Sequence, residues 1–385
     1  MKGFIAFIAL ALLTASSAFA EGFLTAEGTR LRMDGKPFRA VSVNKWDLFI
    51  DYRGVIYDDN MNKSGSKEHA LASIKRVKDN GFNVIRFAAS GYYPVQNGDW
   101  GKPGYFAALD AIVDCAKKEG MYLIPVVLWN PYLYPDTARE PLREMIVNPD
   151  SRSRQYAELF AHQLASRYKD ETTVLFWELT NELNLQADLE TAGEAKYVYF
   201  NNNSTDRGAP PMRTGADNFS TMEMAGFMKH IAEIMKRYDP NHLISSGYTL
   251  PHPWGYVDNI NTDTDEGIAD LFARSHPDPI DIISVHYYSG DEKRFGKGDA
   301  AEGLGTLKRA ADKVGKPFFV GETYLADEPK GAKDSFIDGV FKAIEKYDIP
   351  ITLMWAVPPG DSGDQLSVLS EDVMAKMREI NKAIK

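Results

Sequence analysis

Two glutamates in this chain each end an apolar run that is typical of a buried β-strand. Glu182, preceded by Asn181, ends the run 174–182, and Glu322 ends the run 316–322. The carboxyl ends of parallel strands meet at the face where α/β barrels carry out chemistry, so both glutamates are candidate catalytic groups. The alternative is that Asn181 and Glu182 open a loop or cap the following helix.

Two carboxyl groups at one rim suit the cleavage of a glycosidic bond. One carboxylic acid protonates the leaving oxygen, and the other, as a carboxylate, meets the developing oxocarbenium carbon. Aromatic rings stack on pyranose faces, and charged or amide groups bind the sugar hydroxyls. Other predicted strand ends supply such side chains, namely Asn44, Trp46, Arg86, Trp129, Asn130, His286, Tyr288 and Trp355.

Each of these side chains also has a plain structural interpretation. Arg86 could pair with any carboxylate of the fold, His286 could be a satisfied core histidine, and Trp355 could be packing material. Further aromatic residues near predicted rim loops could form outer subsites, although packing is the favoured interpretation for each of them. They are Tyr92, Tyr93, Trp100, Tyr132, Tyr134 and Trp254.

Strand-like apolar runs and helical periods alternate along the chain. The predicted strands are 39–44, 83–87, 122–128, 174–180, 243–247, 281–286, 317–322 and 351–355. The predicted helices are 67–80, 105–119, 151–168, 221–238, 267–275, 303–314, 332–346 and 370–384, with C-caps at Gly81 and Gly120. Eight such pairs predict an α/β fold, a single (β/α)8 TIM barrel over residues 21–385. A doubly wound open sheet usually carries a glycine-rich phosphate loop after its first strand, and residues 44–49 contain no glycine.

Two features are expected in addition to the barrel. Residues 29–38 alternate around Asp34 and Gly35, a turn signal that predicts an N-terminal β-hairpin. A long loop, 183–220, follows the fourth strand, and loops of this length are usually functional or disordered. Its position directly after Glu182 favours a wall or lid of the site, with a surface excursion as the alternative.

Residues 1–20 have the layout of a secretory signal peptide. Lys2 precedes the apolar run 4–13, and residues 18–20 form an A-x-A cleavage pattern. The apolar run is too short to anchor the chain in a bilayer. We therefore expect cleavage before Glu21 and a secreted or periplasmic protein without a membrane anchor.

Composition narrows the possible partners. The formal net charge of −10 argues against nucleic acid or an anionic membrane surface, and it is compatible with a neutral saccharide. Cys115 is the only cysteine, so no disulfide can form within the chain. It is interpreted as a small buried residue rather than a nucleophile. We expect a monomer.

Metal-dependent hydrolysis is disfavoured. The seven histidines form no H-x-H or H-E-x-x-H arrangement. The acidic segment 261–267 suggests calcium, but its glycine is misplaced for an EF-hand loop, and a solvated loop is favoured. We therefore expect no metal and no cofactor.

The order of the motifs resembles glycoside hydrolase family 5 of the clan A barrels, which includes β-mannanases and endo-β-1,4-glucanases. The resemblance covers nearly the whole mature chain. It rests on Arg86 at strand two, Asn181-Glu182 at strand four, His286 and Tyr288 at strand six, Gly321-Glu322 at strand seven and Trp355 at strand eight.

The resemblance implies a role for each matching residue. Glu182 would be the acid/base, Glu322 the nucleophile and Asn181 the ligand of the sugar 2-hydroxyl. Arg86 and Tyr288 would brace the nucleophile, His286 would join the hydrogen-bond network, and Trp355 would be the floor of the −1 subsite.

The sequence departs from the family pattern at strand three. Many members have a histidine after that strand, whereas this chain has Trp129 and Asn130, and similar pairs occur in the mannanase branch. The expectation is a retaining endo-β-1,4-mannanase that acts on an oligo- or polysaccharide by double displacement. The alternatives are an endo-β-1,4-glucanase, an exo-acting β-glucosidase or mannosidase and, from a different class, a non-catalytic carbohydrate-binding barrel.

Overall fold

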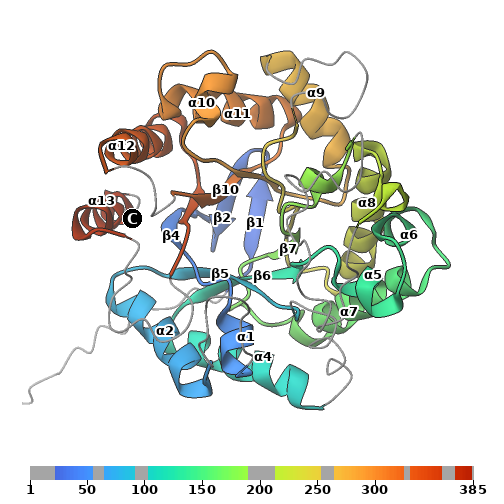
Figure 1. Ribbon diagram of the computed structural model, residues 1–385. Coiled ribbons are helices and arrows are strands. Elements are labelled where there is room, and N and C mark those ends of the chain that lie inside the picture. The colour runs from blue at the N-terminus through green and yellow to red at the C-terminus, as the bar shows by residue number, and fades with distance from the viewer. Residues whose placement is uncertain are drawn as a thin grey trace, which may run out of the picture.

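The computed structural model of the chain describes residues 22–54, 65–91, 103–189, 213–252, 264–324, 330–357 and 369–383. At its centre lies a sheet of eight parallel strands in the order β8-β7-β6-β5-β4-β11-β10-β9. An isolated parallel bridge between Ser245 and Ile282 joins the two outer strands, so the sheet closes into a barrel (Figure 1). The predicted TIM barrel is confirmed. Its strands are β4 (Ala40–Asn44), β5 (Val84–Ala88), β6 (Tyr122–Leu128), β7 (Trp177–Thr180), β8 (Ile244–Ser245), β9 (Ile283–His286), β10 (Phe318–Thr323) and β11 (Ile351–Met354).

Helices surround the barrel on its outer side (Figure 1). The longer ones are α2 (Lys67–Asp79), α4 (Pro103–Glu119), α7 (Arg152–Tyr168), α8 (Thr221–Tyr238), α9 (Asp265–Ser275), α11 (Ala300–Val314), α12 (Lys330–Tyr347) and α13 (Glu371–Ala383). Each lies within a few residues of a predicted helix. Gly81 and Gly120 follow two of them with φ values of 89° and 64°, as expected of left-handed C-cap glycines.

Several short elements differ from the prediction. The helices α1 (Leu48–Tyr52), α5 (Leu133–Ala138), α6 (Leu142–Val147) and α10 (Asp291–Arg294) were not predicted. Each spans at most 6 residues, which is too short for a helical period to show in the sequence. The predicted strands 174–180 and 243–247 are also longer than β7 and β8. In the first of them, Val174 makes only an isolated bridge to Leu123.

A separate three-stranded antiparallel sheet precedes the barrel. It contains β1 (Leu24–Glu27), β2 (Arg30–Met33) and β3 (Lys36–Pro37). Asp34 and Gly35 connect β2 to β3 with φ values of 50° and 75°, as a type I′ hairpin turn requires. The predicted hairpin is confirmed, and β1 adds one strand to it.

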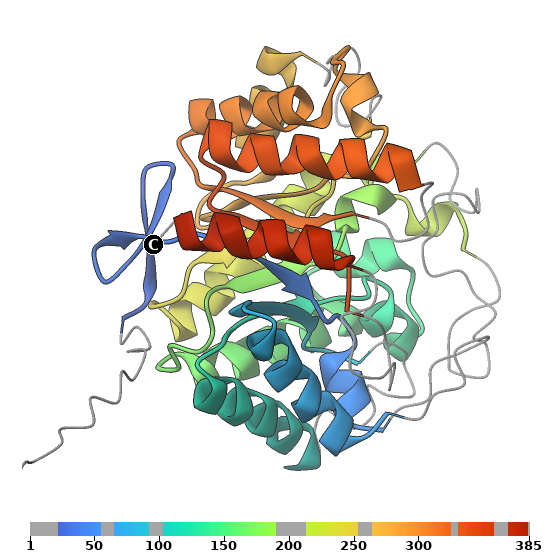
Figure 2. The same cartoon turned by 90° about the vertical axis from the view of Figure 1, so that its left-hand side faces the viewer.

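The small sheet covers the end of the barrel where the strands begin (Figure 2). Its apolar side chains, such as Leu31 and Met33, share one buried cluster with Val84, Ile282 and Ile351 near the starts of barrel strands. The opposite end of the barrel remains for the site. None of the helices in the described ranges combines the length and the apolar character that a bilayer span requires.

Candidate active site

The side chains singled out from the sequence come together at the carboxyl ends of the barrel strands. Asn44 and His286 end β4 and β9, and Trp355 directly follows β11. Glu182 lies two residues after β7, and Glu322 is the next-to-last residue of β10. Strands that are far apart in the sequence therefore supply neighbouring groups, as barrel closure demands.

Arg86 of β5 is the hub of the site. Its Nη1 donates to Glu322 Oε1 at 2.7 Å and to Asn44 Oδ1 at 3.0 Å, and its Nη2 donates to Asn181 Oδ1 at 2.8 Å. Its Nε donates to Glu178 Oε1 at 2.8 Å, and Nη2 donates to the same oxygen. All five donors of the guanidinium are thus used within the protein. Burial alone would lower the pKa of Arg86, but the two glutamates raise it, so the guanidinium stays charged.

His286 connects the two candidate catalytic glutamates. Its Nδ1 lies 2.8 Å from Glu182 Oε1 and 3.4 Å from Glu322 Oε2. One carboxylate oxygen of each glutamate and one imidazole nitrogen all lie within 4.8 Å of one another. The other nitrogen, Nε2, faces Gly321, where a Cβ would come within 2.9 Å of it. A glycine before Glu322 therefore leaves the imidazole the space that it occupies.

The surroundings separate the protonation states of these groups. Burial raises the pKa of Glu182 to about 7, although the positive charge of Arg86 opposes the shift. Burial lowers the pKa of His286 to about 3, so the imidazole is neutral. Burial and the adjacent Glu322 raise the pKa of Tyr288, whose hydroxyl donates to Glu322 Oε2 at 2.6 Å. Glu182 is consequently able to hold a proton near neutral pH beside Glu322.

The spacing of Glu182, His286 and Glu322 would also suit a metal ion, but two features of the site disfavour one. Both oxygens of Glu322 already accept hydrogen bonds, from Arg86 and Tyr288. A cation bound there would also lie close to the buried guanidinium, which disfavours it by like-charge repulsion. We interpret the three side chains as a hydrogen-bond network.

The backbone at Glu182 is held in an uncommon conformation. Its φ of 54° lies in the left-handed region, and its N–H donates to the Gly247 carbonyl at 2.8 Å. Gly247 itself has a φ of 74°, and a Cβ there would overlap the Thr180 carbonyl oxygen. The contact between the ends of β7 and β8 therefore depends on this glycine.

Three indoles are stacked along one side of the site. The ring of Trp129 lies 6.1 Å from that of Trp46 and 6.3 Å from that of Trp355, with interplanar angles of 16° and 12°. Trp129 is 3% exposed and also covers Arg86, whose Cζ lies 5.0 Å from the ring centroid. Trp46 and Trp355 are partly exposed. The outer two indoles therefore present surface, and Trp129 supports them from between.

Two predicted binding residues have their polar atoms engaged inside the protein. Asn44 is fully buried, and its Nδ2 donates to the Gly321 carbonyl at 2.9 Å. Asn130 Oδ1 accepts from the backbone N–H of Tyr132 at 2.9 Å. The structure places both residues at the site, as supports of its backbone and of Arg86.

Glu178 is the site residue that the sequence reasoning missed. It lies in β7 and accepts from Nε and Nη2 of Arg86, whereas Glu322 accepts from Nη1. A signal for it was present, because Glu178 is the one charged residue in the apolar run 174–180. A charge inside a buried strand needs a partner, and that partner, Arg86, lies on another strand.

The long loop after β7 is described at its two ends. A 3-10 helix over Leu183–Gln186 leaves the strand, and Ala187 pairs with Phe219 where the chain returns. On the returning side, Arg213 forms a buried ion pair with Asp136 at 2.7 Å. Residues 190–212 lie outside the described residues, so the predicted wall or lid is not tested.

The aromatic residues predicted near rim loops are only partly within the described residues. Tyr132 and Tyr134 are buried, which confirms packing for both. Tyr92, Tyr93, Trp100 and Trp254 lie outside the described residues, as do residues 1–20, which were predicted to be a signal peptide, and residues 261–263. The remainder of the acidic segment differs from the favoured loop, because Thr264 is the N-cap of α9 and accepts from the N–H of Gly267.

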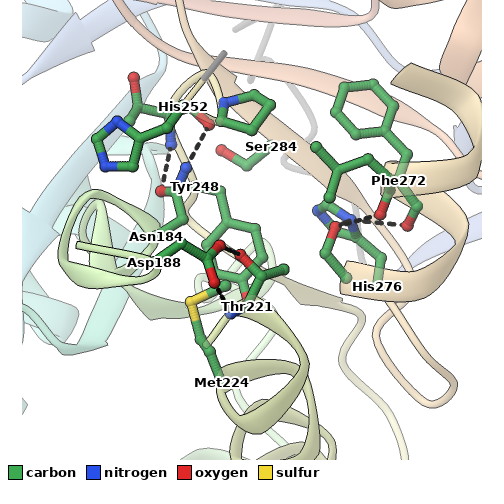
Figure 3. A pocket seen from close by; sticks show the side chains of 13 residues that line it. Asn184, Asp188, Thr221, Met224, Tyr248, His252, Phe272, His276 and Ser284 are labelled. Atoms are coloured by element: carbon green, nitrogen blue, oxygen red, sulfur yellow. Dashed lines mark hydrogen bonds between the residues drawn. The ribbon is translucent and has the colours of Figure 1, made fainter. Parts of the chain in front are cut away.

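A cavity lies beside the site, between the barrel wall and the helices α8 and α9 (Figure 3). Asn184 Nδ2 donates to the Thr249 carbonyl at 2.9 Å, and the Thr221 hydroxyl donates to Asp188 at 2.6 Å. The first bond ties the chain after β7 to the chain after β8, and the second ties it to the first residue of α8. Neither Glu182 nor Glu322 is among the lining residues, so the cavity is separate from the carboxylate pair.

Known proteins resemble this chain in sequence and in fold. A family model described as Cellulase (glycosyl hydrolase family 5) matches residues 50–359. The mannan endo-1,4-beta-mannosidase 8 of Oryza sativa subsp. japonica is 26% identical over 290 residues, which cover 68% of this chain and 67% of that protein. Across the curated relatives that it matches, the chain spans from 60% to 82% of their lengths.

Solved structures share the fold. The endo-1,4-beta-mannanase from Rhizomucor miehei superposes with a TM-score of 0.65 at 17% identity, covering 94% of this chain and 99% of that one. The beta-mannanase from the blue mussel Mytilus edulis gives a TM-score of 0.59 at 13% identity, covering 94% and 97%. At such identities the likeness concerns the fold.

Proposed function

This chain belongs to glycosyl hydrolase family 5, and from that premise we propose that it is a retaining hydrolase of β-1,4-glycosidic bonds in mannans. The observation that carries the proposal is the closeness of Glu182 and Glu322, since one carboxylate oxygen of each lies within 4.8 Å of the other. Retaining enzymes hold their carboxyl groups ~5–5.5 Å apart, whereas inverting enzymes leave ~6.5–9.5 Å for a water molecule. The short separation therefore favours a covalent intermediate.

In the proposed reaction, Glu322 is the nucleophile and Glu182 is the acid/base. Glu182 gives its proton to the leaving glycosidic oxygen while a Glu322 oxygen bonds to the anomeric carbon. The charge of Glu322 disappears in the resulting ester, so Glu182 loses an electrostatic reason to keep a proton. Glu182 then takes a proton from water, which attacks the anomeric carbon and releases Glu322.

The neighbouring residues orient this chemistry. Arg86 and Tyr288 each bond one oxygen of Glu322, which fixes the direction of the nucleophile. Because Asn181 Oδ1 accepts from Arg86, its Nδ2 is the group that would donate to a sugar hydroxyl. Trp46 and Trp355 offer partly exposed rings for stacking on the sugar.

The choice of mannan is supported by the relatives and by one motif. The matching rice protein is named a mannan endo-1,4-beta-mannosidase, and Trp129-Asn130 follows strand β6 where many members of the family have a histidine. Endo action on a long chain is the form of activity that we propose. An endo-β-1,4-glucanase and an exo-acting glucosidase or mannosidase are the alternatives within the class.

A substrate panel tests this function. Reducing-sugar release is measured on galactomannan, glucomannan, carboxymethylcellulose and xylan, and the product lengths separate endo from exo action. We expect release from both mannans as a series of oligosaccharides. Release from carboxymethylcellulose alone would support the glucanase, and monosaccharide as the first product would support exo action. Binding without release would favour a carbohydrate-binding barrel.

Two variants test the roles of the glutamates. Glu322→Ala should abolish turnover, because no other group can form the covalent intermediate. Glu182→Ala should still cleave aryl glycosides with good leaving groups, and azide should accelerate it and yield a β-azide of retained configuration. NMR of the first-formed anomer is the check, and an inverted wild-type product would refute the mechanism.

We further propose that the chain is exported as a monomer and that its signal peptide is removed before Glu21. The A-x-A pattern at 18–20 and the apolar run before it support export.

A further inference from the structure

Glu178 is a third carboxylate in the site, and the proposed reaction does not use it. Its side chain is fully buried, and Oε1 accepts hydrogen bonds from Nε and Nη2 of Arg86. Within the described part of the chain, its second oxygen, Oε2, has no hydrogen-bond partner. Burial of a carboxylate is costly, so a group kept in this way calls for a reason beyond packing.

The charges of the site suggest that reason. Arg86 carries one positive charge and contacts both Glu178 and Glu322. Without Glu178, the positive charge of Arg86 would be offset by Glu322 alone, and the charge around Glu182 would be less negative by one unit. A nearby positive charge favours the ionised form of a carboxyl group. Glu182 would then give up its proton at a lower pH.

We propose that Glu178 is a positioning residue that acts through Arg86. It engages two of the five guanidinium donors and, together with Glu322, offsets the positive charge of Arg86, so that Glu182 keeps the proton that the leaving group needs. The inference rests on the proposed function, since it concerns the acid of that reaction. It assigns to a third carboxylate, Glu178, a role in setting the pKa of Glu182.

Glu182 is surrounded by charged or titratable groups from several elements, and all of them contribute to its field. They are Arg86 of β5, Glu178 of β7, His286 of β9, Tyr288 and Asp291 after β9, and Glu322 of β10. His286 is neutral and Tyr288 keeps its proton. Burial raises the pKa of Glu178, whereas the positive charge of Arg86 and its hydrogen bonds to Oε1 oppose that shift and favour the ionised carboxylate. Burial also raises the pKa of Asp291, to about 6, so this residue can add a further charge near Glu182.

Glu178→Gln separates the charge from the hydrogen bonds. The amide oxygen can accept from Nε and Nη2 of Arg86 as Oε1 does. The amide nitrogen then takes the place of Oε2, which has no partner to lose among the described residues. The exchange therefore removes one negative charge and keeps the shape of the side chain.

The pKa of Glu182 is the first readout, because it needs no substrate. Protein labelled with ¹³C at the glutamate carboxyl carbons is titrated by NMR, and the Glu182 signal is assigned by its loss in Glu182→Gln. In the wild type it should titrate at about 7. In Glu178→Gln it should titrate lower by on the order of one unit. The alkaline limb of kcat/KM should move down by the same amount.

Two further variants keep the test decisive. Glu178→Asp retains the charge, so its Glu182 pKa should stay near that of the wild type even if kcat falls. Asp239→Asn neutralises another buried carboxylate, which lies outside the site and contacts Trp177 and His242. This variant should not move the alkaline limb of kcat/KM. Circular dichroism establishes that each variant is folded.

An unchanged Glu182 pKa in folded Glu178→Gln overturns the proposal. If Glu178→Gln does not fold, the test moves to Glu178→Asp. A lowered Glu182 pKa in that variant overturns the proposal, and an unshifted alkaline limb of its kcat/KM supports the proposal. Failure of the proposed function is recognised separately. A protein that cleaves none of the glycans but whose Glu182 pKa falls in Glu178→Gln refutes the function and keeps this inference.

Discussion

Glu182 and Glu322 have the same side chain but different surroundings. Both oxygens of Glu322 accept from permanent donors, the Arg86 guanidinium and the Tyr288 hydroxyl. Glu182 faces a neutral imidazole instead, and its burial raises its pKa. Two donors therefore orient the carboxylate at position 322, whereas burial favours the protonated form at position 182. The division between nucleophile and acid that we propose follows from these partners.

The raised pKa of Glu182 predicts the alkaline limb of activity. The protonated form is the active acid, so kcat/KM should fall as pH rises through about 7. The measurement is a pH–rate profile in the wild type and in Glu182→Ala, with an aryl glycoside whose leaving group needs no acid. The limb should be absent from the variant. If it persists there with the same midpoint, another group is the acid.

Trp355 tests the aromatic side of the site. Trp355→Ala should reduce kcat by orders of magnitude and leave the protein folded, because this indole is only partly buried. Its loss of stability should be smaller than the ~3–5 kcal/mol typical of a core Trp→Ala change.

The fully buried Trp177 offers a matched control for that variant. Trp177→Ala should show the larger loss of stability by chemical denaturation. If Trp355→Ala unfolds and its activity per folded molecule is unchanged, Trp355 is a core residue and does not contact the sugar.

At the scale of elements, the ends of neighbouring strands hold the site together by backbone contacts. Glu182 leaves β7 in a left-handed conformation and donates its N–H to Gly247 after β8. His286 ends β9 beside Gly321 of β10. Both approaches are too close for a side chain on the glycine. The geometry of the carboxylate pair thus depends on two residues that carry no functional group.

Gly247→Ala tests this dependence. A Cβ at this position would overlap the Thr180 carbonyl oxygen, so we expect a loss of several kcal/mol together with loss of activity. Gly315→Ala is the matched control, since Gly315 also has a positive φ of 82° but no atom within 4 Å of the added Cβ. It should cost only about 1 kcal/mol. Denaturant unfolding measures both, and equal losses would contradict the close approach.

At the scale of the whole molecule, the barrel separates stability from chemistry. The small sheet β1–β3 covers one end with apolar contacts, and the site occupies the other end. Stability must come from the core, because a single cysteine allows no disulfide within the chain. The fold therefore depends on packing without a covalent cross-link inside the chain.

Export itself makes a prediction about the chain terminus. If residues 1–20 are a signal peptide, the protein recovered from a periplasmic or extracellular fraction should begin at Glu21. N-terminal sequencing or intact mass measures this directly. A cytosolic protein that retains Met1 would contradict the export proposal and would leave the barrel and its site untouched.

Local sequence patterns were sufficient for the barrel and for most of its rim. Apolar runs and helical periods predict elements because each residue's burial depends on its neighbours in the chain. The strand ends then follow, and with them the positions of Glu182, His286 and Glu322. The short helices α5 and α6 escaped prediction because one turn or two cannot show a period.

The sequence by itself determined which residues reach the rim, and only the tertiary structure decided what they do to one another. That Glu178 and Glu322 bind the same guanidinium, or that Trp129 lies buried between two indoles, depends on distances across the closed barrel. These distances join strands separated by many residues, and no local pattern encodes them. The pKa of Glu182 belongs to the same class, because burial and charge are properties of the assembled site.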